Sequence, residues 1–80
     1  MTIAVIDIGT NTVLLLIARI NSSGQIATIV YEQRVPRLGT GVDAERNLPP
    51  DSIQRVIDVL AEYKSIIDHH HPDRTVVAQL

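Results

Sequence analysis

The chain of 80 residues contains no cysteine, no phenylalanine and no tryptophan, and only two tyrosines. Without cysteine it has no disulfide framework and no thiol chemistry, which is typical of a reducing compartment. With so few aromatic rings, stacking on nucleic-acid bases is not an expected binding mode. The core must therefore be aliphatic.

The chain also lacks a strong net charge and a long apolar run. Its formal charge of −2 and pI near 5.8 create no general attraction to nucleic acid or to an anionic membrane. No run approaches a membrane span, and the amino terminus lacks the basic region of a secretory signal. We therefore expect a cytoplasmic protein with no nucleic-acid or membrane partner, which recognises any anionic ligand through a few local groups.

The most informative segment is Asp-Ile-Gly-Thr-Asn-Thr at positions 7–12, which separates two apolar runs. Two strands joined by such a short turn predict a hairpin. Gly9 lets the backbone bend and approach a ligand without a Cβ in the way. The N–H groups of Gly9 to Thr12 could then point into one concavity, and the side chains of Thr10, Asn11 and Thr12 add further donors. The turn is a predicted phosphate-binding loop.

Asp7 would repel a bare phosphate. Its predicted partner is a divalent cation, which proteins hold with one or two carboxylates, waters and phosphate oxygens. The alternative is purely conformational, because Asp, Gly and Asn are also common in hairpin turns that bind nothing.

Three segments together resemble one family. Residues 3–13 resemble the first phosphate loop of the actin-like ATPase superfamily, in the Thr-Asn-Thr variant of the exopolyphosphatase/guanosine pentaphosphate phosphohydrolase (Ppx/GppA) family. Residues 34–43, Arg-Val-Pro-Arg-Leu-Gly-Thr-Gly-Val-Asp, are similar to the stretch that follows that family's third strand. Residues 48–53 are similar to its next helix start. Two positions depart from the pattern: Leu14 replaces a usual Arg or His, and Pro49 replaces a common capping Ser.

The resemblance implies hydrolysis of a phosphoanhydride. The substrate would be inorganic polyphosphate, or guanosine pentaphosphate losing its 5′ γ-phosphate. The loop would hold the terminal phosphoryl group, and Asp7 would position Mg²⁺ directly or through water. A glutamate is the family's general base, and none of Glu32, Glu45 and Glu62 fits that role, so it is expected beyond Leu80.

Two other functions remain open. One is an ATP-dependent phosphotransferase of the sugar-kinase or acetate-kinase type, against which the Arg-Leu-Gly-Thr-Gly-Val stretch argues. The other is a non-catalytic actin-like module that binds a nucleotide or alarmone. This alternative stays open because Leu14 stands where the family usually has a basic residue.

The expected fold is α/β and ribonuclease-H-like. Three antiparallel strands are predicted at residues 2–7, 12–19 and 26–35, then a helix that begins near Pro50 and a fourth strand that opens at residue 76. The first strand should be buried on both faces. By the resemblance, residues 1–80 form the first half of the first of two actin-like domains, with the rest beyond Leu80. The chain alone is not expected to be catalytic.

The predicted helix carries two apolar stripes. The first, expected to cover the sheet, contains Ile53, Val56, Ile57, Leu60 and Ile67. The second contains Val59, Tyr63 and Ile66, and it predicts another packing partner, either a later helix or a second chain in a homodimer.

Two groups of basic residues have competing interpretations. His69, His70 and His71 point in different directions from a helix end, so a favourable interaction with the helix dipole is expected rather than metal binding. Arg34 and Arg37 flank a glycine-containing loop, and each could contact phosphate or be an ordinary surface residue of an edge strand. Arg37 is the preferred phosphate ligand of the two.

Overall fold

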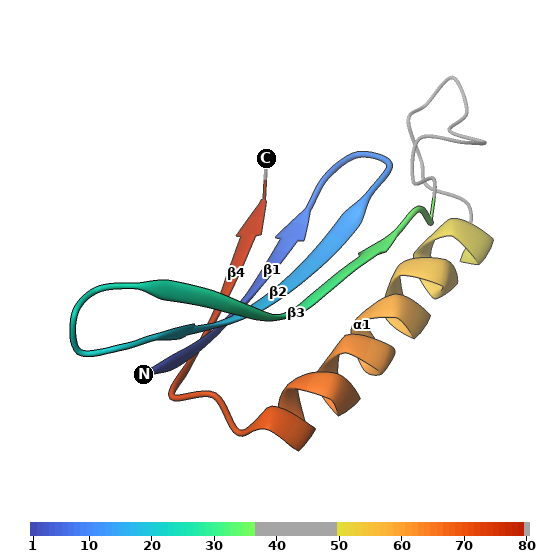
Figure 1. Ribbon diagram of the computed structural model, residues 1–80. Coiled ribbons are helices and arrows are strands. Elements are labelled where there is room, and N and C mark those ends of the chain that lie inside the picture. The colour runs from blue at the N-terminus through green and yellow to red at the C-terminus, as the bar shows by residue number, and fades with distance from the viewer. Residues whose placement is uncertain (37–49, 80) are drawn as a thin grey trace.

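A computed structural model of the chain describes residues 1–36 and 50–79. Four strands form a single sheet in the order β3-β2-β1-β4, and one helix lies across one face of it (Figure 1). The elements are β1 (Thr2–Ile8), β2 (Val13–Ile20), β3 (Ile26–Arg34), α1 (Pro50–His70) and β4 (Arg74–Gln79). The predicted α/β architecture of three antiparallel strands, a crossover helix and a further strand is confirmed. β4 begins two residues earlier than the predicted position 76.

β1 and β2 lie at the centre of the sheet. They pair antiparallel without interruption from Thr2 opposite Arg19 to Ile8 opposite Val13. β4 joins the other edge of β1 in parallel, from Ile3 opposite Arg74 onward, and β3 pairs antiparallel with β2. Because successive side chains of a strand alternate between faces, this register assigns every strand residue to one side of the sheet.

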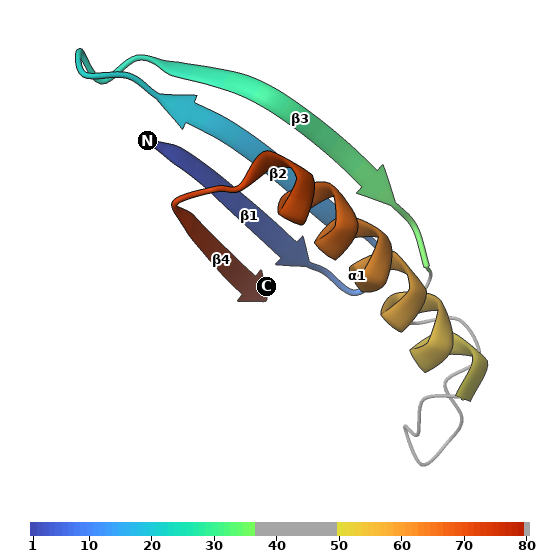
Figure 2. The same ribbon diagram turned by 90° about the horizontal axis from the view of Figure 1, so that it is seen from below.

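The core lies between α1 and one face of the central strands (Figure 2). Its buried members are Ala4, Ile6, Val13, Leu15, Ile17 and Tyr63. Fully burying one large aliphatic side chain stabilises a fold by about 1.5–3 kcal/mol, so this single layer supplies most of the packing energy of the described residues. The opposite face is less covered. Ile3, Val5 and Asp7 are only half-buried, so the expectation that the first strand is buried on both faces is wrong for these residues.

The helix packs through both stripes: besides the one expected to face elsewhere, Leu60 and Ile67 of the stripe expected to cover the sheet also pack against the core. Val59, Tyr63 and Ile66 contact the core, and Tyr63 is fully buried. Ile53 and Ile57, from the stripe expected to cover the sheet, are 45% and 51% exposed. The rotation has a physical cause: the Tyr63 ring fills the layer, and its hydroxyl reaches a backbone acceptor on β2 only when this face is turned inward.

A side-chain-organised turn links β2 to β3. The Asn21 Oδ1 atom accepts hydrogen bonds from the N–H groups of Ser23 and Gln25 at 3.0 and 2.9 Å. Gly24 follows with φ of +84°, a conformation that glycine adopts without steric penalty. The predicted second hairpin is confirmed.

The carboxyl end of α1 is closed by a left-handed residue. His71 has φ of +48°, and its N–H donates to the Ile67 carbonyl at 3.1 Å, as in an αL C-cap. Pro72 and Asp73 then lead into β4, and Asp73 exchanges two hydrogen bonds with the Thr2 backbone. Within the described ranges, no helix is long and apolar enough to cross a membrane.

The rotation of α1 can be tested with two isoleucines of the helix. Ile66→Ala should lower the free energy of unfolding of the 80-residue chain by roughly 2 kcal/mol, because Ile66 packs against the core. Ile57→Ala removes the same atoms from a side chain that is 51% exposed and should lower it by less than about 1 kcal/mol. Urea denaturation followed by circular dichroism measures both. Equal losses, or a larger loss for Ile57→Ala, would contradict the observed packing.

Candidate functional site

The loop of residues 9–12 lies at one end of the sheet, between β1 and β2. It is closed at its base by a hydrogen bond from the Gly9 N–H to the Thr12 carbonyl oxygen, 2.8 Å long. A Cβ on residue 9 would lie 3.2 Å from that same oxygen, so glycine permits the close approach of the two strands of the loop. The Gly9 N–H is therefore used within the hairpin, which differs from the expectation that it faces a ligand.

The remaining groups of the loop are available to a ligand. Thr10 and Asn11 are exposed and Thr12 is half-buried. Among the described residues, no hydrogen-bond partner is found for their N–H groups or for their side chains. Three successive backbone donors, two hydroxyls and one amide at a tight turn form a good receptacle for phosphate oxygens.

Asp7 lies next to this loop, on the face of the sheet that α1 does not cover. Its neighbours across the ladder are Leu14 on β2 and Ala78 on β4, so neither can neutralise a carboxylate. The Oδ1 atom is buried and has no hydrogen-bond partner among the described residues. A buried, unpaired carboxylate oxygen is costly unless something compensates it. A hard cation such as Mg²⁺ prefers this ligand, so the residues present fit the predicted metal.

A second polar cluster lies on the other face of the sheet, against α1. The Tyr63 hydroxyl donates to the Val13 carbonyl oxygen at 2.7 Å. The Arg34 guanidinium lies over the Tyr63 ring, 6.0 Å from its centroid, and binds the carboxylates of Glu62 and Glu32 at 2.6 and 2.9 Å. The hydrogen bonds that Arg34 donates to Glu62 and then to Glu32 raise the pKa of Arg34 above its ordinary value. The cluster joins β2, β3 and α1 directly behind the loop.

This cluster settles the two interpretations of Arg34. Its guanidinium is engaged by two carboxylates on the α1 side, whereas Asp7 lies on the opposite face, so Arg34 is not aimed at the candidate site. Glu32 and Glu62 are likewise committed to Arg34. Arg37, residues 39–41 and Glu45 lie outside the described residues.

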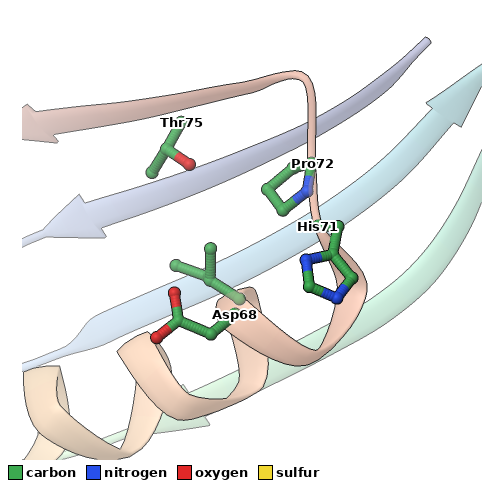
Figure 3. A pocket seen from close by; sticks show the side chains of 5 residues that line it. Asp68, His71, Pro72 and Thr75 are labelled. Carbon is green, nitrogen blue, oxygen red and sulfur yellow. The ribbon is translucent and has the colours of Figure 1, made fainter.

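The three histidines do not form a metal site. His69 and His70 contact each other edge to face, with ring centroids 5.3 Å apart, and His71 is the C-cap. His71 and Thr75 line a hollow of about 340 Å³ beside the end of α1 (Figure 3). Among the described residues, no group of three potential metal ligands occurs.

Sequence reasoning overlooked Tyr63 as part of the site's surroundings. A signal was present: Tyr63 is the single tyrosine in an otherwise aliphatic helix stripe, and a buried tyrosine usually needs a hydrogen-bond partner for its hydroxyl. What could not be read from the stripe is which acceptor it would find.

Comparison with known proteins gives consistent relatives, although no family model matches the chain. The chain is 37% identical over 75 residues to exopolyphosphatase 2 of Mycobacterium tuberculosis, a match that covers 90% of the chain and 24% of that protein. Its fold is similar to a Ppx/GppA phosphatase of Aquifex aeolicus, with a TM-score of 0.90 and 38% identity over 99% of the chain. An exopolyphosphatase of Cytophaga hutchinsonii gives a TM-score of 0.89 at 30% identity, again over 99% of the chain.

The chain spans about a quarter of the length of these relatives. The resemblance to the Ppx/GppA family noted from the loop and its following segments is thus confirmed in both sequence and fold. The sheet and helix correspond to the first part of the fold of these phosphatases.

Because Tyr63 is buried, we expect the free energy of unfolding to change with pH in the alkaline range. Burial raises the pKa of its hydroxyl above the ordinary value of 10.0. Above about pH 10 the unfolded chain releases this proton before the folded chain does, so the free energy of unfolding should fall as pH rises. In Tyr63→Phe this part of the decline should disappear. Urea denaturation of both proteins from about pH 8 to about pH 11 measures the difference, and parallel curves would contradict the assignment.

Proposed function

We propose that the protein containing this chain is a phosphoanhydride hydrolase that releases terminal phosphate from inorganic polyphosphate. The observation that carries the proposal is the hairpin end, where donors of Thr10, Asn11 and Thr12 lie beside the buried oxygen of Asp7, all without partners among the described residues. Donors that can bind phosphate oxygens, next to a carboxylate that can bind a metal ion, suit a phosphate chain with a bound metal ion. The names of the similar proteins from M. tuberculosis and C. hutchinsonii support the same reaction.

The loop would act on the phosphoryl group that is transferred. Water attacks the terminal phosphorus, and the bond from phosphorus to the bridging oxygen breaks. The products are orthophosphate and a polyphosphate chain that is one unit shorter. Negative charge on the phosphoryl oxygens must be stabilised throughout this transfer. The N–H groups and side chains of residues 10–12 are fixed donors for those oxygens, and fixed donors need no reorganisation during the reaction.

Asp7 would hold the divalent cation of the site. When bound, Mg²⁺ supplies positive charge that neutralises phosphate oxygens and helps to orient the chain. Asp7 would place that charge at the end of β1, directly before the loop, and Leu14 opposite it on β2 carries no positive charge that would compete for the carboxylate.

Guanosine pentaphosphate presents the same terminal phosphoanhydride, so we include it in the proposed substrate class. The described residues contain no feature that selects a guanosine moiety over a longer phosphate chain. Glu32 and Glu62 bind Arg34 on the opposite face from Asp7, so neither is a candidate for the general base. We keep the proposal that a glutamate from the remainder of the protein activates the water.

The role of Asp7 can be tested in the full-length protein with long-chain polyphosphate and Mg²⁺. Asp7→Asn keeps the shape but removes the charge, so kcat/KM for phosphate release should fall by roughly a hundredfold, and more Mg²⁺ should be needed for half-maximal rate. Asp68→Asn is the matched control, because Asp68 forms an exposed ion pair with Lys64 near the carboxyl end of α1.

Three outcomes would contradict parts of this account. Full activity in Asp7→Asn would remove Asp7 from the site. Phosphate transfer from ATP to an acceptor, without release from polyphosphate, would indicate a phosphotransferase. Tight binding of polyphosphate or guanosine pentaphosphate without turnover would indicate a binding module.

A threonine pair tests the loop itself. Thr10→Val removes one exposed donor without changing side-chain shape and should raise KM for polyphosphate by roughly tenfold, because hydrogen bonds to charged groups are the stronger ones. Thr28→Val makes the same change on exposed β3 and should leave KM unaltered. Steady-state phosphate release measures both variants, and equal KM values would exclude a ligand role for the Thr10 hydroxyl.

A further inference from the structure

At the carboxyl end of the loop, two successive backbone carbonyl groups each accept a hydrogen bond. The Thr12 carbonyl accepts from the Gly9 N–H at 2.8 Å, which closes the turn on itself. The next carbonyl, that of Val13, accepts from the Tyr63 hydroxyl at 2.7 Å. The first bond is local, whereas the second joins groups 50 positions apart and attaches the loop to the helix.

Tyr63 is itself held in place. Its side chain is fully buried among the aliphatic residues of β1 and β2. Arg34 lies over its ring, and two ion pairs hold the guanidinium, one to Glu62 on α1 and one to Glu32 on β3. The hydroxyl therefore has a fixed position relative to both the helix and the sheet.

Packing alone does not account for a tyrosine here. Phenylalanine would fill the same space in the core without a hydroxyl that must be satisfied. The hydroxyl meets the carbonyl immediately after the last residue of the loop, at the point where β2 begins. A bond at this point restricts the backbone that carries the donors of Asn11 and Thr12.

We infer that Tyr63 is a positioning residue for the phosphate loop. Its hydrogen bond to the Val13 carbonyl fixes the exit of the loop, so that the N–H groups of residues 10–12 are aligned before a phosphate arrives. This inference rests on the proposed function, since it assigns Tyr63 to the same site. Preorganised donors bind without an ordering cost, so loss of the bond should weaken binding more than it alters turnover.

The test compares Tyr63→Phe with Tyr31→Phe in the full-length protein. Each variant loses one phenolic oxygen. Tyr31 lies on β3 and is 59% exposed, and its hydroxyl forms no hydrogen bond with the described residues, so it is the matched control. Thermal unfolding shows first that both variants are folded at the assay temperature.

The first readout needs no activity. Backbone ¹⁵N relaxation gives order parameters for the amides of Thr10, Asn11 and Thr12. They should fall in Tyr63→Phe and remain unchanged in Tyr31→Phe, while the amides of Ser22 to Gly24 in the other hairpin stay constant. Unchanged loop amides in a folded Tyr63→Phe protein would overturn the inference, whatever the protein hydrolyses.

The second readout is kinetic. With polyphosphate and Mg²⁺, Tyr63→Phe should raise KM by roughly fivefold and leave kcat within about twofold of wild type. A merely structural role would lower stability and active fraction without changing KM, and that result would overturn the inference. Absence of phosphate release by the wild-type protein would instead refute the proposed function, and the order parameters would still decide the role of Tyr63.

Discussion

The uninterrupted antiparallel pairing of β1 with β2 is the constraint on which the other features of this chain depend. It runs from Thr2 to Ile8, brings the two ends of the loop within hydrogen-bond distance, and leaves only residues 9–12 to make the reversal. The same pairing provides the surface to which β4, β3 and α1 attach. A one-residue slip would move Val13, Leu15 and Ile17 away from the face that α1 covers, so their burial there maintains the register.

This register also separates two kinds of polar chemistry. On the face away from α1, Asp7 has apolar neighbours across the ladder and an oxygen with no partner in residues 1–36 and 50–79. This arrangement is poor for stability alone and suitable for a cation. On the face toward α1, Arg34 is paired with Glu62 and the Tyr63 hydroxyl donates to the Val13 carbonyl, so both groups have partners within the fold. The unsatisfied groups therefore lie where a ligand would bind, and the satisfied groups lie behind them as support.

Local sequence signals were sufficient for much of the fold. Alternation and turn residues predict the strands and both hairpins, and Pro72 with the preceding histidines predicts the end of α1. The inward face of the helix was predicted only in part: Leu60 and Ile67 pack against the core as expected, whereas Ile53 and Ile57 are exposed. The Tyr63 stripe also faces the core, because the tertiary bond of Tyr63 to Val13 turns it inward. Two other contacts also depend on partners that no local pattern specifies. They are the hydrogen bond of the Gly9 N–H inside the turn and the ion pair of Arg34 with Glu62. The composition of the loop does indicate anion binding, but only the structure shows which N–H and hydroxyl groups are available to a ligand.

The most direct test of the central claim, that the first hairpin is a metal-dependent phosphate site, is an NMR titration of the ¹⁵N-labelled full-length protein with tripolyphosphate in the presence of Mg²⁺. The account predicts saturable shifts of the Thr10, Asn11 and Thr12 amides that require Mg²⁺ and are lost in Asp7→Asn, with no shift at Ser22 to Gly24. Shifts of equal size in both hairpins, or none in the first, would contradict it.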